Sequence, residues 1–243
     1  MGGEAAVIAE VRRFPDAAAL TAAAADRITS EARDAVRRRG RFFWVLSGGR
    51  TPLPVYERLA GVGSFPWART HVFWGDERCV PRGSPESNAG RALRVLLDRV
   101  PIPREQIHLP PVGAGPPARA AARWEEDLRR FFGRDARRPA FDLVLLGLGT
   151  DGHTASLFPG DPALDEKGRW TAAVEGAGAS PPVARLTLTA AALGGARHAL
   201  FLIVGSAKAR LVRHIQTDPT AALRYPAGRI ATLLPCTWYV AEG

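Results

Sequence analysis

The residue best suited to acid–base chemistry is His153, which directly follows a glycine-rich turn, Gly147-Leu148-Gly149-Thr150-Asp151-Gly152. Histidine titrates near neutral pH, so in a polar loop it can serve as a general base, although a lone histidine is more often structural. Asp151 could orient the imidazole or hold a substrate hydroxyl. Its ordinary interpretation is a turn-forming aspartate before glycine.

The same turn formally satisfies the pattern GxGxxG after an apolar run, which makes a dinucleotide site an alternative hypothesis. A dinucleotide fingerprint opens a long helix at once, whereas Pro159 and Pro162 interrupt this segment within ten residues. The motif also lies past the middle of the chain, after at least three expected strands. The context therefore disfavours a nicotinamide site.

A second segment, Ser47-Gly48-Gly49-Arg50-Thr51-Pro52, is a small-residue turn that enters a helix. Glycines let backbone N–H groups approach an anion, and the helix N-terminus adds its partial positive charge. A tight turn without a ligand explains the pattern equally well. A P-loop is excluded, because GxxxxGK[ST] is absent.

Charged residues follow two further apolar runs. Asp76, Glu77 and Arg78 come just after Val72-Phe73-Trp74, where a solvated cluster is the ordinary interpretation. Lys208, one of two lysines in the chain, falls in the first turn of an expected helix, where the helix dipole disfavours a cation. A cation there is favourable if an anion binds beside it.

These segments end strands of an expected α/β fold. Apolar runs predict strands at Val7–Val11, Phe42–Leu46, His71–Trp74, Asp142–Leu146, Val183–Leu188, Ala199–Val204 and Cys236–Val240. Helical patterns predict helices from Asp16 to Arg39, from Pro52, and over Asn88–Val100, Ala118–Phe132 and about Ser206–Gln216. The alternation indicates one domain, 1–243, with three layers: a mostly parallel sheet with helices on both faces, Rossmann-like. Ligands of such sheets bind beyond the carboxyl ends of the strands.

Composition narrows the class of protein. The 243 residues are 46% hydrophobic, and 33 lysines and arginines against 24 acidic residues give a net charge of +9. This charge suggests nucleic-acid binding as a hypothesis. Arginines spread over solvated helix faces explain the charge better, so we expect no nucleic-acid partner. No apolar stretch is long enough for a membrane span, and the N-terminus lacks a secretion signal, so we expect a cytoplasmic protein without a membrane partner. Cys79 and Cys236 are far apart and fit neither a disulfide framework nor a zinc site.

The motifs together resemble the 6-phosphogluconolactonase family, within the larger group that includes glucosamine-6-phosphate deaminases and isomerases. The resembling segments are LSGGRTP (Leu46–Pro52), FWGDERCVP (Phe73–Pro81) with Ser87-Asn88, GLGTDGHTASLFPG (Gly147–Gly160), RLTLT (Arg185–Thr189) and VGSAKA (Val204–Ala209). They span about residues 46–209 in the expected order.

The resemblance implies hydrolysis of 6-phosphoglucono-1,5-lactone to 6-phosphogluconate, a step of the oxidative pentose phosphate pathway, without metal or organic cofactor. It makes His153 the base that activates water and Arg78 the cation near the lactone. It assigns the substrate phosphate to Ser47, Gly48, Gly49, Arg185 and Lys208. The remaining matches line the pocket, with Asp151 beside the base and Thr51, Asp76 and Asn88 on the binding side.

Two alternatives remain. The deaminase and isomerase relatives continue after their DGH with an Asn-Glu-Pro-like stretch that supplies a second carboxylate, whereas residues 154–159 here contain no acid before Asp161. A non-catalytic sugar-phosphate-binding protein is the other, and the intact DGH disfavours it. The C-terminal segment Leu233–Gly243 departs from the family ending, and Thr217–Arg229 receives no role. The oligomeric state is open, and a monomer is compatible with the sequence.

Overall fold

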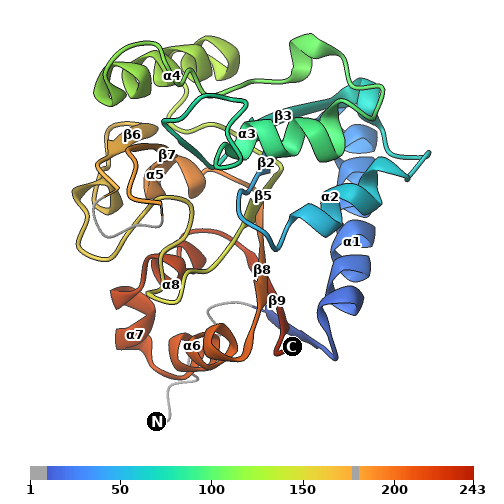
Figure 1. Cartoon of the computed structure of the whole chain (residues 1–243), viewed down its shortest axis with the longest axis vertical. Helices are drawn as coiled ribbons and strands as arrows, with labels where there is room; N and C mark the ends of the chain where they lie inside the picture. Colours follow the sequence, from blue (N-terminus) through green and yellow to red (C-terminus); the bar gives the residue numbers. More distant parts are fainter. Residues whose placement is uncertain (1–9, 177–180) are drawn as a thin grey trace.

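A parallel six-stranded sheet forms the centre of the molecule (Figure 1). The computed structural model describes residues 10–176 and 181–243. The strand order is β1-β9-β8-β5-β2-β3, and every neighbouring pair is parallel. In that order the strands are Glu10–Phe14, Cys236–Ala241, His198–Val204, Leu143–Leu146, Phe42–Leu46 and Thr70–Trp74. The predicted α/β class is confirmed.

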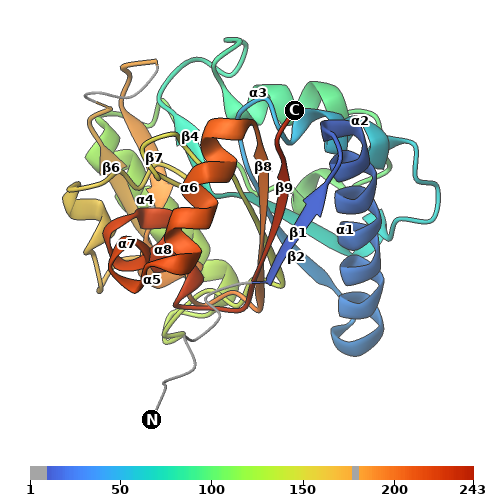
Figure 2. The same ribbon diagram turned by 90° about the horizontal axis from the view of Figure 1, so that it is seen from below.

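Helices cover both faces of this sheet (Figures 1 and 2). One face carries α1 (Ala17–Arg39), α2 (Leu53–Ala60) and α3 (Asn88–Ala92), and the other carries α4 (Pro117–Phe132), α5 (Ala190–Leu193), α6 (Ser206–Thr217), α7 (Pro219–Arg224) and α8 (Pro226–Ala231). No helix within the described ranges is long and apolar enough to cross a membrane.

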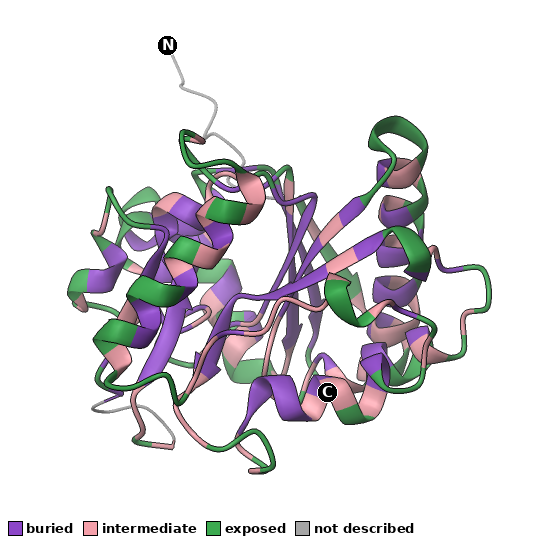
Figure 3. Ribbon diagram, turned by 90° about the horizontal axis from the view of Figure 1, so that it is seen from above, coloured by how far each residue is buried: buried purple, intermediate pink, exposed green. Residues whose placement is uncertain are grey.

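The strands alternate their side chains between two apolar cores. In β2, Trp44 and Leu46 pack with α1 and α2, whereas Val45 faces the opposite core. Because successive strand side chains point to opposite faces, a strand covered on both sides must be apolar throughout. Figure 3 shows the result: the central strands are almost wholly buried, and exposed positions lie on outer helix faces and loops.

A second, antiparallel sheet lies beside the first and corrects the sequence analysis. Its strands are β4 (Asp76–Arg78), β7 (Arg185–Leu188) and β6 (Thr171–Val174), in the order β4-β7-β6. We expected Val183–Leu188 to complete the main sheet and Asp76–Arg78 to be a charged segment after a strand. A three-residue polar strand has no apolar period to mark it, and pairing partners are not readable from periodicity.

The first long helix follows the prediction closely. Asp16 caps α1 through Oδ1, which accepts from the N–H of Ala19 at 2.8 Å. Gly40 ends the helix with φ of 76°, a left-handed conformation that glycine adopts without strain. Arg37, Arg38 and Arg39 fill its last turn, where cations face the negative end of the dipole.

Two predicted boundaries are wrong. The helix expected over Asn88–Val100 is α-helical only to Ala92 and continues as one π-helical turn, Leu93–Leu97. The strand expected at Val7–Val11 continues to Phe14, three residues beyond its predicted end, and its predicted start lies outside the described residues. The second shift arises because β1 is a largely exposed edge strand, so its apolar pattern is weak.

Two histidines, His71 on β3 and His108, pack in an aromatic cluster between the sheet and α4. His71 Nδ1 and His108 Nε2 lie 3.1 Å apart, and the His108 ring stacks on Phe73 with 4.4 Å between centroids. Burial lowers the pKa of both imidazoles; that of His108 falls to about 4, with the charge of His71 adding to the effect, and Arg41 adds to the effect on His71. The hydrogen bond also needs one ring nitrogen without a proton.

This pair predicts acid sensitivity between pH 6.5 and 4. The unfolded chain binds a proton at His108 near pH 6.5 and the folded chain only near pH 4, so stability is full above 6.5 and falls across the interval. The upper limit of the loss is about 3 kcal/mol. Urea unfolding at pH 7 and 4.5 measures it, and His108→Phe should lose less than the wild type. Equal losses would assign the sensitivity to other groups.

Candidate active site

The strand order brings the predicted segments to one place. The chain passes from β2 outward to β3 and then crosses back to β5 on the other side of β2, so the order reverses between β2 and β5. Such switch points open a crevice at the carboxyl ends of the strands. The segments after β3, β2, β5 and β8, four adjacent strands, therefore meet there.

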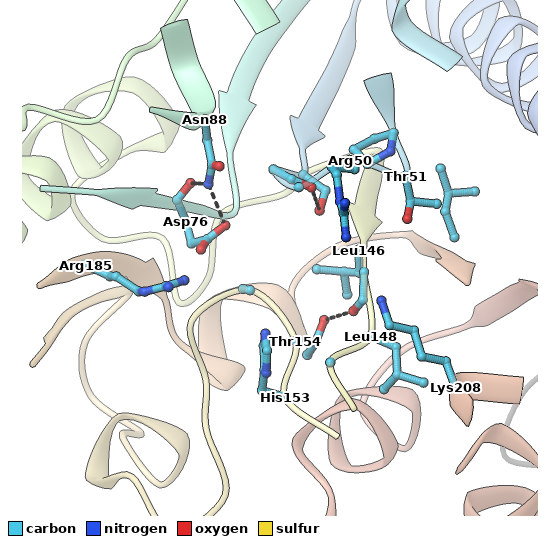
Figure 4. Close-up of a pocket in the computed structure, with 18 of the residues that line it drawn as sticks. Arg50, Thr51, Asp76, Asn88, Leu146, Leu148, His153, Thr154, Arg185 and Lys208 are labelled. Carbon is cyan, nitrogen blue, oxygen red and sulfur yellow. Dashed lines mark hydrogen bonds between the residues drawn. The ribbon is translucent and has the colours of Figure 1, made fainter. Parts of the chain in front are cut away.

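A pocket of about 190 Å³ occupies this crevice (Figure 4). Most of the sequence-predicted residues line it: Ser47, Gly48, Gly49, Thr51, Asp76, Arg78, Asn88, His153, Arg185 and Lys208. Asp151 is not among the lining residues and contacts His153 instead. The spatial convergence predicted from strand ends is thus observed, with Asp151 displaced to a supporting position.

The turn after β2 is fixed by a buried tyrosine. The Tyr56 hydroxyl, on α2, donates to the carbonyl of Ser47 at 2.8 Å and accepts from its N–H at 3.0 Å. Burial raises the pKa of this phenol, so the hydroxyl remains a donor. Gly48 lies directly against the Asn88 side chain, and a Cβ at this position would overlap the amide. Glycine is required here for close approach.

Two arginines face each other across the antiparallel pair β4–β7. Arg78 is registered opposite Arg185, and their exposures are 11% for the Arg78 side chain and 3% for Arg185. Like charges directly opposite on a sheet are unfavourable. Burial lowers the pKa of Arg185, Asp76 raises it and Arg78 lowers it further. Two guanidinium groups that lie close together at one pocket are typical of an anion site.

Asp76 is the acidic member of this wall. Its Oδ2 accepts from Ser156 Oγ at 2.6 Å, and its Oδ1 accepts from Asn88 Nδ2 at 3.2 Å. Figure 4 shows Asn88 bridging to Asp76, with the Arg185 side chain directed toward the same space. The carboxylate is 6% exposed and thereby connects β4, α3 and the loop after β5.

His153 is oriented by Asp151. His153 Nδ1 and Asp151 Oδ1 lie 2.6 Å apart, and Oδ1 also accepts from the His153 N–H at 3.1 Å. An ionised carboxylate can only accept, so Nδ1 carries the proton, and in the neutral ring Nε2 then keeps its lone pair. The ring packs on Phe158 with 4.7 Å between centroids. Of the two roles left open for Asp151, the geometry favours orientation of the imidazole.

The opposite side of the pocket is basic. Lys208, in the first turn of α6, and Arg50, in the turn after β2, point toward the same part of the pocket (Figure 4). Burial lowers the pKa of Lys208, and the charge of Arg50 lowers it further. A bound anion would relieve this repulsion. The sequence analysis did not select Arg50, because one arginine among many carries no compositional signal.

Other contributors were also missed. Thr154 donates from Oγ1 to the carbonyl of Gly147 at 2.8 Å and closes the turn that carries His153. The segment Thr217–Arg229, left without a role, packs on that turn: the Tyr225 ring lies against Gly152, and the N–H of Ala227 donates to the Gly152 carbonyl at 3.1 Å. Its signals were Pro219 and Pro226, which stand at the starts of α7 and α8.

The loop after β5 does not open a helix. After His153 the chain forms only a short 3₁₀ turn, Pro162–Leu164, capped by Asp161 Oδ1, which accepts from the N–H of Ala163 at 2.8 Å. The GxGxxG turn therefore lacks the helix that a dinucleotide fingerprint requires, as its context predicted. Asp161 is engaged in this cap.

In the part of the pocket wall formed by β4 and α3, Arg78 Nε and Asn88 Oδ1 have no hydrogen-bond partner among the described residues. A buried polar atom without a partner costs about 1–3 kcal/mol, so such atoms mark places where a ligand or water completes the bonding. Both belong to the wall formed by β4 and α3.

The geometry of the His153 turn depends on Gly149. A Cβ at Gly149 would overlap both His153 Nδ1 and Asp151 Oδ1, whereas a Cβ at Gly147 would have Ser47 Oγ at 3.9 Å as its nearest neighbour. Gly149→Ala should therefore displace the imidazole, and Gly147→Ala should leave it in place. The ring proton resonances of His153 measure this by NMR. Equal shifts in the two variants would contradict the assignment.

Comparison with known proteins identifies the family of the chain. The family model described as glucosamine-6-phosphate isomerases/6-phosphogluconolactonase matches residues 15–238. A 6-phosphogluconolactonase of Nostoc sp. is 39% identical over 218 residues, 89% of each chain. One of Synechocystis sp. is 42% identical over 201 residues, 82% of each chain.

Solved structures give the same result. The crystal structure of 6-phosphogluconolactonase from Thermotoga maritima superposes with a TM-score of 0.84 at 32% identity, covering 96% of this chain and 100% of that one. That from Trypanosoma brucei has a TM-score of 0.84 at 28% identity and covers 96% of each chain. The chain belongs to the family of glucosamine-6-phosphate isomerases and 6-phosphogluconolactonases.

Proposed function

We propose that this chain hydrolyses 6-phosphoglucono-1,5-lactone to 6-phosphogluconate. The observation that carries the proposal is the pairing of His153 with Asp151 at a pocket whose other walls present four cations, Arg50, Arg78, Arg185 and Lys208. The names of the relatives, which match over most of the chain, support the same activity.

His153 acts as the general base. With Nδ1 protonated and held by Asp151, Nε2 takes a proton from water while the water oxygen attacks the lactone carbonyl. The tetrahedral intermediate then collapses, the bond between C1 and the ring oxygen breaks, and the imidazolium returns its proton to the leaving oxygen. The leaving group stays tethered, so no covalent enzyme intermediate is needed.

The paired arginines stabilise the charge that develops on the carbonyl oxygen. The resemblance assigned Arg185 to the phosphate, but Arg185 is registered opposite Arg78, so we place it on the carbonyl side instead. Arg78 and Arg185 are already buried and oriented before substrate binds, Arg78 by a hydrogen bond from Nη1 to the carbonyl of Glu86 at 2.7 Å. Preorganised donors of this kind need little reorganisation in the transition state. The unfavourable repulsion between the two arginines is thus offset when negative charge develops on the carbonyl oxygen.

The phosphate binds on the basic side. The backbone of Ser47, Gly48 and Gly49 faces the pocket together with Arg50 and Lys208. A dianion between the latter two relieves their repulsion, which makes the phosphate a remote handle that positions the ring. Thr51, Asp76 and Asn88 line the remaining wall and are assigned to the sugar hydroxyls.

The deaminase or isomerase alternative is less well supported. Ring opening in those relatives uses a second carboxylate after the DGH, and here the pocket receives Thr154 and Ala155 from that segment. Asp161, the first acid after His153, caps the following turn instead.

The first test is hydrolysis of freshly generated lactone in the presence of a chelator. The wild type should hydrolyse it well above the spontaneous rate, and His153→Ala should lose about 10²–10⁴-fold in kcat, because the proton acceptor is gone. Unchanged turnover in His153→Ala would remove this residue from the mechanism. Release of ammonia from glucosamine 6-phosphate, without lactone hydrolysis, would establish the alternative instead.

The phosphate grip is tested separately. Lys208→Ala removes a charge-assisted bond to the phosphate but no group at the reacting carbonyl, so KM should rise about 10- to 100-fold with little change in kcat. Steady-state kinetics on the lactone measure the split, and Lys167→Ala is the matched control because Lys167 is exposed and outside the pocket. A fall in kcat at constant KM would contradict this role.

A further inference from the structure

The buried carboxylate of Glu77 is the group in this region that the mechanism leaves unused. It is the middle residue of β4, and its flanking residues Asp76 and Arg78 both line the pocket while Glu77 does not. Successive strand residues point to opposite faces, so the sequence Asp-Glu-Arg directs two functional side chains one way and Glu77 the other. Glu77 is 0% exposed.

Four hydrogen bonds hold this carboxylate, two at each oxygen. Oε1 accepts from the backbone N–H of Arg78 at 2.7 Å and of Asn88 at 2.8 Å. Oε2 accepts from the N–H of Ala89 at 2.7 Å and from Ser87 Oγ at 3.0 Å. Burial raises the pKa of Glu77, with all four bonds acting against that rise. Every lone-pair position faces a donor, so the ionised form fits this environment.

The donors belong to the start of α3. Its first N–H groups have no acceptor within the helix, and Glu77 takes two of them while Ser87 Oγ takes the N–H of Gly90 at 2.9 Å. The carboxylate therefore ties α3 to β4 across the loop that separates them. Asn88 opens α3, and its Nδ2 donates to the Asp76 carbonyl at 3.0 Å.

We infer that Glu77 is a positioning residue, whose carboxylate sets the placement of Arg78 and Asn88 in the pocket. Arg78 is bound through its own N–H and Asn88 through its own N–H, both to the same oxygen of Glu77. These are the two residues whose buried Nε and Oδ1 lack partners among the described residues. The inference rests on the proposed function for its kinetic consequence only.

Glu77→Gln tests this at constant side-chain size. The amide NH₂ would face two donors at one oxygen position, so the strand and helix must shift there. We expect kcat on the lactone to fall about 10- to 100-fold and KM to rise by a smaller factor, because Asn88 shifts away from the sugar whereas Arg50 and Lys208 lie on the other side of the pocket. Ser87→Ala, which removes one of the four bonds, should also lower kcat more than it raises KM, with a smaller effect on kcat than Glu77→Gln.

Two controls separate positioning from folding. Glu57→Gln makes the same chemical change on the exposed side of α2 and should leave kcat and KM unchanged. Ile28→Val, on the buried face of α1, should lower Tm without lowering kcat at a temperature where the protein is folded. If Ile28→Val, at a matched Tm, loses as much kcat as Glu77→Gln or Ser87→Ala, the effect is stability alone and the inference fails.

A second readout does not depend on catalysis. In NMR spectra, the Arg78 Nε–H and Asn88 side-chain amide resonances should shift in Glu77→Gln, while the affinity for inorganic phosphate stays within about threefold of the wild type. Unshifted resonances would overturn the inference even with reduced activity. An inactive wild type would overturn the proposed function, and the resonances would still decide the role of Glu77.

Discussion

The arrangement of the site depends on one unfavourable contact, the pairing of Arg78 with Arg185 across two antiparallel strands. Two guanidinium groups in register repel each other, and burial strengthens the repulsion because the effective dielectric constant is lower. Oxygen atoms of two neighbouring acidic residues partly compensate this positive charge. Asp76 lies near Arg185, and Glu86 supplies Arg78 with its carbonyl and a carboxylate oxygen 3.7 Å away.

The small antiparallel sheet holds the two arginines at the edge of the pocket. The parallel sheet alone would end in four loops at the crevice, and loops give weaker control of side-chain direction than paired strands. β4 and β7 instead fix the two arginines by backbone register. Gly75, between β3 and β4, is held by backbone hydrogen bonds: its N–H donates to the carbonyl of Leu46, and its carbonyl accepts from the N–H of Leu188. The backbone positions of Arg78 and Arg185 are therefore set by strand pairing, whereas Arg50 and Lys208, on the side we propose for the phosphate, come from a turn and a helix start.

The sequence was sufficient to locate the site because its signals were local. Strand ends, the turn before His153 and a lysine at an unfavourable place on a helix are all readable in short windows, and the parallel strand order brought them together. Pairing between distant segments was not readable. Asp76–Arg78 has no periodic pattern, so neither its strand character nor its register with Arg185 could be predicted, and the role of Tyr225 depends on contacts that only the fold defines.

The distribution of charge explains why the net charge says less about the pocket than the position of each cation does. On α4, Arg123, Arg129 and Arg130 pair with acids one turn away, so these arginines report a solvated helix face. Arg185 and the Arg78 side chain differ in being largely buried, and Lys208 is half-buried, and burial increases the energetic weight of a cation. A net charge of +9 sums both kinds equally. Lys208 and Arg78, which line the pocket, differ from these surface arginines in two ways: neither has a carboxylate partner at i,i+4 on a helix, and each follows the end of a strand of the main sheet.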